Sequence, residues 1–205
     1  MSRDAAGPDG KAEPKRHRPF LASGLAGLAV VVTSLVLMTV FPAKAPRLPE
    51  GFFTPIIAFE FIQDKEDVSA LFGPAGSQIR QSTIRKMDLG NRLDFGYMVL
   101  YGAFLFIFCL QTYLLTGKRW FLLGAFMTFV ILAGDVLENI QLLGITALLA
   151  SGNFDGQLRL LHLFTWLKWG GIVAVFLILL PFFISMGRFG KVICGAVLLT
   201  LVLSV

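Results

Sequence analysis

Ionisable side chains recur at helical spacing inside long apolar stretches of this sequence. Asp135, Glu138 and Asn139 lie three and four positions apart, which places them on one face of a helix. Lys168 lies in the next apolar stretch. Carboxylates and a lysine in such stretches suit general acid–base chemistry or the binding of a charged group. If the protein is an enzyme, which the sequence leaves open, we expect Asp135, Glu138 and Lys168 to be catalytic.

Further polar residues share these helical faces. At 1.5 Å per residue, Tyr101, Glu138 and Lys168 lie roughly 10–18 Å below the same membrane surface. Three helices therefore bring polar groups to one depth, and we expect a single shared cluster. The predicted ligand-binding residues are Asp94, Tyr97, Tyr101, Asn139, His162, Thr165 and Trp169.

Two other interpretations of the cluster stay open. A charged side chain at mid-bilayer costs about 2.5–3.5 kcal/mol on insertion scales, so an ion pair of Lys168 with Asp135 or Glu138 would hold the helices together as structural glue. Asp135, Glu138 and His162 form a weak metal-site pattern, because only one histidine lies in these stretches. We expect no metal and no other cofactor. The sequence contains neither GxSxG nor GxxxxGK[ST], which argues against a serine hydrolase and an ATPase.

The composition identifies the apolar stretches as membrane spans. The 205 residues are 56% hydrophobic and 15% charged, whereas soluble proteins carry about 25% charge. This excludes a disordered, collagen-like, coiled-coil or disulfide-framework protein. The net charge of +5 does not indicate nucleic-acid binding, because the basic residues lie mainly beside apolar stretches. We expect membrane lipids as partners, and buried free thiols at Cys109 and Cys194.

The predicted fold is an all-α integral membrane protein, a bundle of five transmembrane helices with a short helical cap on the outer face. The fifth helix, near the C-terminus, is short, since it reaches only about 21 Å of a core about 30 Å thick. The predicted parts are a basic cytoplasmic tail (1–19), transmembrane helix 1 (20–41), the extracytoplasmic cap (42–93) and a four-helix transmembrane bundle (94–205). The bundle spans are expected at 94–116, 120–150, 160–186 and 192–205.

The first span also has features of a signal peptide, namely a basic segment before it and a small-residue site at 43–45. We favour a retained anchor, because the apolar run is longer than the usual h-region of about 7–15 residues. Basic residues in the tail, at 118–119 and at 188–191 fall on one side of alternating spans. That side is predicted to be cytoplasmic, with the N-terminus.

The cap over 42–93 is predicted to contain three short helices rather than a mobile linker. Thr54 and Asp64 are expected to cap the first two, and the third is expected over 77–89. Glu60 lies in the first helix between two phenylalanines. It either points inward to a site or faces water, and the sequence does not decide between these.

The segments "TPIIAFEF", "LDFGYMVLYGAFL", "GDVLENIQLL" and "FTWLKWGG" resemble a group of uncharacterised bacterial integral membrane proteins with LD…Y, DxxEN and LKW span motifs. The resemblance covers roughly residues 54–180. It implies a multi-pass protein of the bacterial inner (plasma) membrane, and it implies no activity. A looser similarity to four-helix sterol-isomerase-like proteins rests on acids in a membrane pocket and transfers no residues.

These features predict a protein that binds or processes a small amphipathic, lipid-like molecule at a polar pocket in the outer half of the bilayer. One alternative is an accessory subunit of a larger membrane complex, and another is a proton- or cation-coupled transporter. A cavity touching Glu138 and Lys168 favours the first function. A dry cluster with direct ion pairs favours the second, and a polar path to the cytoplasmic side favours the third.

Overall fold

The computed structural model describes residues 20–188, 190, 192 and 195, and this part of the chain is all-α, without a strand. The helices are α1 (Leu21–Val40), α2 (Pro55–Glu60), α3 (Lys65–Phe72), α4 (Gln78–Thr116), α5 (Phe121–Leu148) and α6 (Asp155–Ser185). Four of them, α1, α4, α5 and α6, are long and apolar enough to cross a membrane. The predicted tail over 1–19 and nearly all of the predicted fifth span over 192–205 lie outside the described residues.

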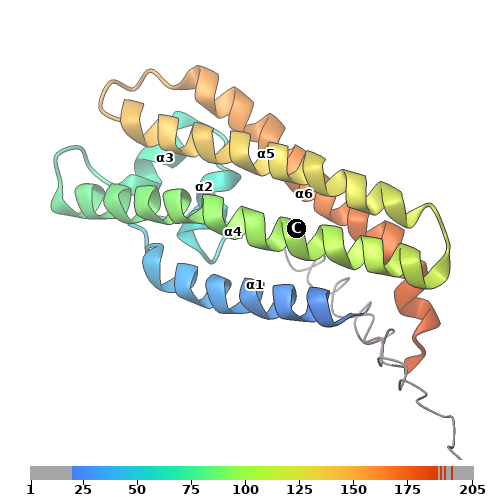
Figure 1. Ribbon diagram of the computed structural model, residues 1–205. Helices are drawn as coiled ribbons and strands as arrows, with labels where there is room; N and C mark the ends of the chain where they lie inside the picture. The colour runs from blue at the N-terminus through green and yellow to red at the C-terminus, as the bar shows by residue number, and fades with distance from the viewer. Residues whose placement is uncertain (1–19, 189, 191, 193–194, 196–205) are drawn as a thin grey trace, which may run out of the picture.

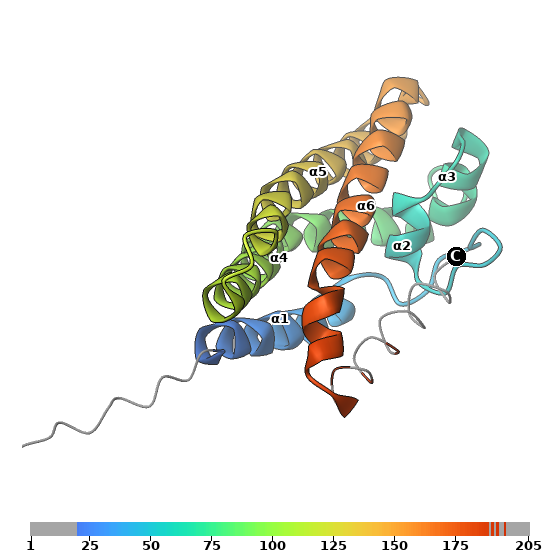
Figure 2. The same cartoon turned by 90° about the vertical axis from the view of Figure 1, so that its right-hand side faces the viewer.

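The helix α5 packs along both α4 and α6 (Figure 1). Short connections join them, as expected for antiparallel neighbours. The helix α1 packs mainly against α4 (Figure 2), and only Ser23 and Leu37 of α1 are buried. A helix that is apolar on all sides and largely exposed suits contact with lipid rather than with water.

The two short helices begin where the sequence predicts. Asp64 caps α3 by accepting a hydrogen bond of 2.8 Å from the backbone N–H of Asp67. Thr54 precedes Pro55, the first residue of α2, although its side chain makes no capping hydrogen bond. Both helices lie beside one end of the long helices, next to α6 (Figure 2).

The third predicted short helix is not a separate element, because α4 runs without interruption from the N-cap Ser77 to Gly117. The sequence interpretation took Gly90 as the end of a helix. In the structure Gly90 makes room for Phe41, whose ring carbon would lie 2.3 Å from a Cβ at this position. Gly117, at φ 69°, adopts the left-handed conformation that ends the helix.

Two apolar clusters fill the bundle, one toward each end. One cluster, around Phe59, Phe72 and Leu142, joins α2 and α3 to the long helices. The other, around Cys109 and Val175, lies between α4, α5 and α6. On each long helix of the bundle, the polar residues predicted from the sequence lie between these two clusters.

Candidate functional site

Lys168 is the centre of a buried charge cluster. Its ammonium lies 3.0 Å from Glu60 Oε2 and 3.3 Å from Asp135 Oδ1, and it also forms an ion pair with Glu138. Lys168, Asp135 and Glu138 are 6%, 5% and 0% exposed. The three residues predicted to be catalytic are therefore brought together, and they are held in direct contact with one another.

Two hydroxyl side chains, those of Thr165 and Tyr101, bond to these ion pairs. The Thr165 hydroxyl lies 2.5 Å from Glu138 Oε1 and 3.1 Å from the carbonyl oxygen of Glu60, and its single hydrogen can serve one of them at a time. The Tyr101 hydroxyl donates to Asp135 Oδ2 at 2.5 Å. The cluster is thus bonded across α2, α4, α5 and α6.

The helix α6 also holds the α2 segment in place. Trp169 Nε1 donates to Glu60 Oε2 at 3.1 Å, and His162 Nε2 lies 2.5 Å from the carbonyl oxygen of Ile62. Because His162 contacts this backbone carbonyl while Asp135 faces Lys168, the metal site considered from the sequence does not assemble. No group of three His, Cys, Asp or Glu side chains within the described ranges is arranged to hold a metal ion.

Asn139 connects α5 to a part of α4 that precedes Tyr101. Its Nδ2 donates to the backbone oxygen of Asn91 at 2.9 Å and to Asp94 Oδ2 at 3.1 Å. Tyr97 accepts a hydrogen bond of 3.0 Å from Ser34 Oγ on α1. These three hydrogen bonds hold the part of α4 around Asp94 and Tyr97 between α5 and α1.

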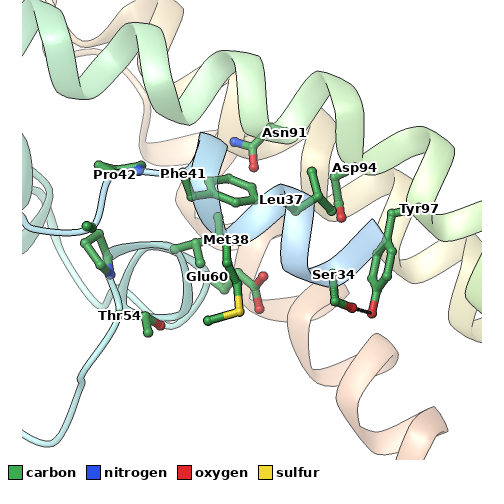
Figure 3. Close-up of a pocket in the computed structure, with 13 residues that line it drawn as sticks. Ser34, Leu37, Met38, Phe41, Pro42, Thr54, Glu60, Asn91, Asp94 and Tyr97 are labelled. Carbon is green, nitrogen blue, oxygen red and sulfur yellow. Dashed lines mark hydrogen bonds between the residues drawn. The ribbon is translucent and has the colours of Figure 1, made fainter. Parts of the chain in front are cut away.

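A cavity of about 410 Å³ lies between α1, α2 and α4 (Figure 3). Its volume falls in the range of about 300–1,000 Å³ that is typical of small-molecule sites. The apolar lining includes Leu37, Met38, Phe41, Pro42 and Ile56. The polar lining includes Ser34, Thr54, Glu60, Asn91, Asp94 and Tyr97.

The predicted site residues divide into two groups around this cavity. Asp94 and Tyr97 line it, whereas Asp135, Glu138 and Lys168 lie behind its wall and are not among its lining residues. Glu60 belongs to both groups, since one carboxylate oxygen contacts Lys168 while the side chain also lines the cavity. Of the two orientations that the sequence left open for Glu60, the structure has the inward one.

Asn91 was missed by the sequence interpretation, which placed it in the cap. It is 1% exposed and lines the cavity. Within the part of the chain that the structure describes, neither its Oδ1 nor its Nδ2 has a hydrogen-bond partner. Buried amides are nearly always bonded, so Asn91 is an exception to this rule at the wall of the cavity.

Comparisons of the chain with models of protein families, with curated proteins and with solved structures found no match. The resemblance to bacterial membrane proteins with LD…Y, DxxEN and LKW motifs thus stays a prediction.

Proposed function

We propose that this protein is an integral membrane protein that binds a small amphipathic molecule in the cavity between α1, α2 and α4. The observation that carries the proposal is the lining of this cavity, in which apolar side chains of α1 lie next to the carboxylates of Glu60 and Asp94. Such a mixed lining suits a molecule with one apolar and one polar part. Because most of α1 is exposed, a ligand dissolved in lipid has a short path to this cavity.

Binding is favoured over chemical conversion. Lys168 forms ion pairs with Asp135 and Glu138, so these three groups bind one another rather than a ligand. They act on a ligand only indirectly, because Lys168 also positions Glu60. The polar groups that a ligand meets directly include Glu60, Asn91 and Asp94.

The proposed topology keeps the predicted orientation. The segment of α2 and α3 lies at the outer face of the bacterial inner membrane, as a cap, and the basic tail lies in the cytoplasm. The proposed bundle has a fifth, short span near the C-terminus. The excess of Lys and Arg beside the other ends of the spans supports this orientation.

A role as an accessory subunit of a membrane complex is the second candidate. The direct ion pairs of Lys168 support it, as does the fact that the cavity is lined by neither Glu138 nor Lys168; both are the outcomes expected for this role. Exposed apolar side chains on α1, such as Leu25 and Leu28, support it too. We rank it second because the cavity beside Glu60 has the mixed lining of a ligand site. Transport has less support, since the half of the bundle beyond Tyr101 contains the apolar cluster around Cys109 and Val175. The buried hydroxyls of Thr112 and Thr128 in this half bond to carbonyls of their own helices.

Photo-crosslinking tests the proposal. The protein in dodecyl maltoside is exposed to three amphiphiles with the same twelve-carbon, diazirine-bearing chain and an amine, alcohol or carboxylate headgroup. We expect saturable labelling of cavity residues by at least one of them. Ala43→Trp adds bulk at the cavity lining and should abolish this labelling. Ala75→Trp, at an exposed site away from the cavity, should preserve it. Absence of cavity labelling by all three probes contradicts the proposal.

A further inference from the structure

We infer that the cavity selects a primary ammonium group carried on an apolar body, and that Glu60, Asp94 and Asn91 together receive this ammonium. The inference rests on the proposed function and names the class of ligand for the same cavity. It is carried by the charges at the wall of the cavity and by the buried Asn91 amide.

The charge around the cavity favours a cation. Lys168 is shared by three carboxylates, those of Glu60, Asp135 and Glu138. Asp94 lies within electrostatic reach of Asp135 and Glu60 and adds a fourth acid. One lysine facing four acids leaves more carboxyl groups than it can neutralise. Two of these acids, Glu60 and Asp94, line the cavity, so a cationic headgroup is attracted there and an anionic one is repelled.

The unused acceptors at the wall match the donors of a primary ammonium. Glu60 uses Oε2 for both Lys168 and Trp169, and Asp94 uses Oδ2 for Asn139. Among the described residues, Glu60 Oε1, Asp94 Oδ1 and Asn91 Oδ1 accept no such bond. Glu60 of α2 and Asn91 and Asp94 of α4 line the cavity (Figure 3). Together they offer three unused acceptors, and a primary ammonium has three N–H donors. A trimethylammonium group has none.

Asn91 distinguishes this arrangement from an ordinary acidic surface. Its side chain lies within hydrogen-bond reach of no described donor or acceptor, although it is almost completely buried. Asn139 bonds to the backbone oxygen of Asn91 and leaves the side-chain amide unused. A bound ammonium supplies a donor for Oδ1, and Nδ2 stays available for an oxygen atom of the ligand close to the amine.

An apolar part of the cavity lining can contact the apolar body of the ligand. Leu37, Met38 and Phe41 of the α1 side line the cavity next to the acids. Phe41 is held there because Gly90 allows its ring to lie against α4. The ammonium and the apolar body therefore meet complementary surfaces within one cavity.

The test compares headgroups on one chain. Competition against the diazirine-bearing twelve-carbon amine is measured with dodecylamine, dodecanol, dodecanoate and dodecyltrimethylammonium. We expect dodecylamine to compete about tenfold better than dodecanol and dodecyltrimethylammonium, as for a charge-assisted hydrogen bond, and dodecanoate to be the weakest. Asp94→Asn should weaken dodecylamine about tenfold and leave dodecanol unchanged. Asp88→Asn is the matched control, since Asp88 lies on the same helix, bonds to Thr146 and does not line the cavity.

A second variant tests the inference if the Asp94→Asn protein does not fold. Asn91→Leu removes the acceptor without adding charge, and it should weaken dodecylamine severalfold while dodecanol competes as well as before. The inference is overturned if dodecanol or dodecyltrimethylammonium competes as well as dodecylamine. The proposed function still stands in that case. An absence of saturable labelling by every probe overturns both.

Discussion

The ammonium of Lys168 on α6 lies 3.0 Å from the carboxylate of Glu60 on α2. Through this ion pair, a charge cluster in the interior of the bundle determines where one wall of the cavity stands. Trp169 binds the same carboxylate oxygen, so Glu60 is held from two sides. The buried cluster and the cavity are therefore connected, because Glu60 belongs to both.

Removal of the Lys168 charge should be strongly destabilising. Lys168→Met leaves three buried carboxylates without their cation, and we expect a loss of about 3–5 kcal/mol in unfolding free energy. Unfolding in dodecyl maltoside, followed by circular dichroism against denaturant, measures it. Lys65→Met is the control, because Lys65 forms a single exposed ion pair of 2.7 Å with Asp155, and such pairs contribute about 0–1 kcal/mol. Equal losses in the two variants contradict the central role of Lys168.

Close packing of α5 on α6 should make Gly134 intolerant of a side chain. A Cβ at Gly134 would lie 3.0 Å from the backbone nitrogen of Lys168, whereas a Cβ at Gly170 would meet nothing within 4 Å. Gly134→Ala should lower the unfolding free energy by about 1–3 kcal/mol, because a helix backbone does not yield easily. Gly170→Ala should be neutral or stabilising by up to about 1 kcal/mol. A neutral Gly134→Ala variant argues against this approach of the two helices.

The Thr165 hydroxyl should contribute more than that of another buried threonine. Thr165 contacts Glu138 and the Glu60 carbonyl on other helices, whereas Thr128 donates only to Gly124 of its own helix. Thr165→Val should cost about 1–3 kcal/mol, since it leaves a buried carboxylate with one fewer donor. Thr128→Val should cost less than about 1 kcal/mol, because the Gly124 carbonyl keeps its helical bond. The comparison uses the same denaturant titration, and the reverse ranking would refute the assignment.

The proposed orientation predicts which loops are accessible from outside the cell. Ser151 and Lys118 are exposed and lie beyond opposite ends of α5. With Cys109 and Cys194 replaced by alanine, Ser151→Cys should react with a membrane-impermeant maleimide in intact spheroplasts. Lys118→Cys should react only after lysis. The opposite pattern reverses the orientation, and labelling of both sites in intact spheroplasts contradicts a membrane-spanning α5.

Local sequence features predicted much of the helical structure. Capping residues located the starts of α2 and α3, and apolar runs located the four long helices, although α4 begins at Gln78 rather than at the predicted residue 94. The spacing of Asp135, Glu138 and Asn139 placed them on one face, and the structure has all three buried on the inner side of α5. These successes share a cause, since helix starts and helix faces are set by residues within a few positions of one another.

The location of the cavity depended on contacts between distant residues and was not predicted. Glu60 lies in a helix that is otherwise apolar. The sequence therefore showed no polar and apolar face of this helix from which the direction of the Glu60 side chain could be predicted. Gly90 resembled a helix terminator, and only the packing of Phe41 explains it. With Gly90 taken as an end, Asn91 was assigned to the cap, and its place beside the cavity went unnoticed.

The contact between Glu60 and Trp169 joins residues 109 positions apart, and this separation sets an order of events during synthesis. At about 5–20 residues per second, roughly 5–20 s pass between translation of α2 and that of the middle of α6. Throughout this interval α2 lacks its contacts with α6, although α5, which it also touches, is synthesised earlier. Glu60, which lines the cavity, is therefore held by Lys168 and Trp169 only after α6 arrives, and chains interrupted before that point leave the ribosome without this support.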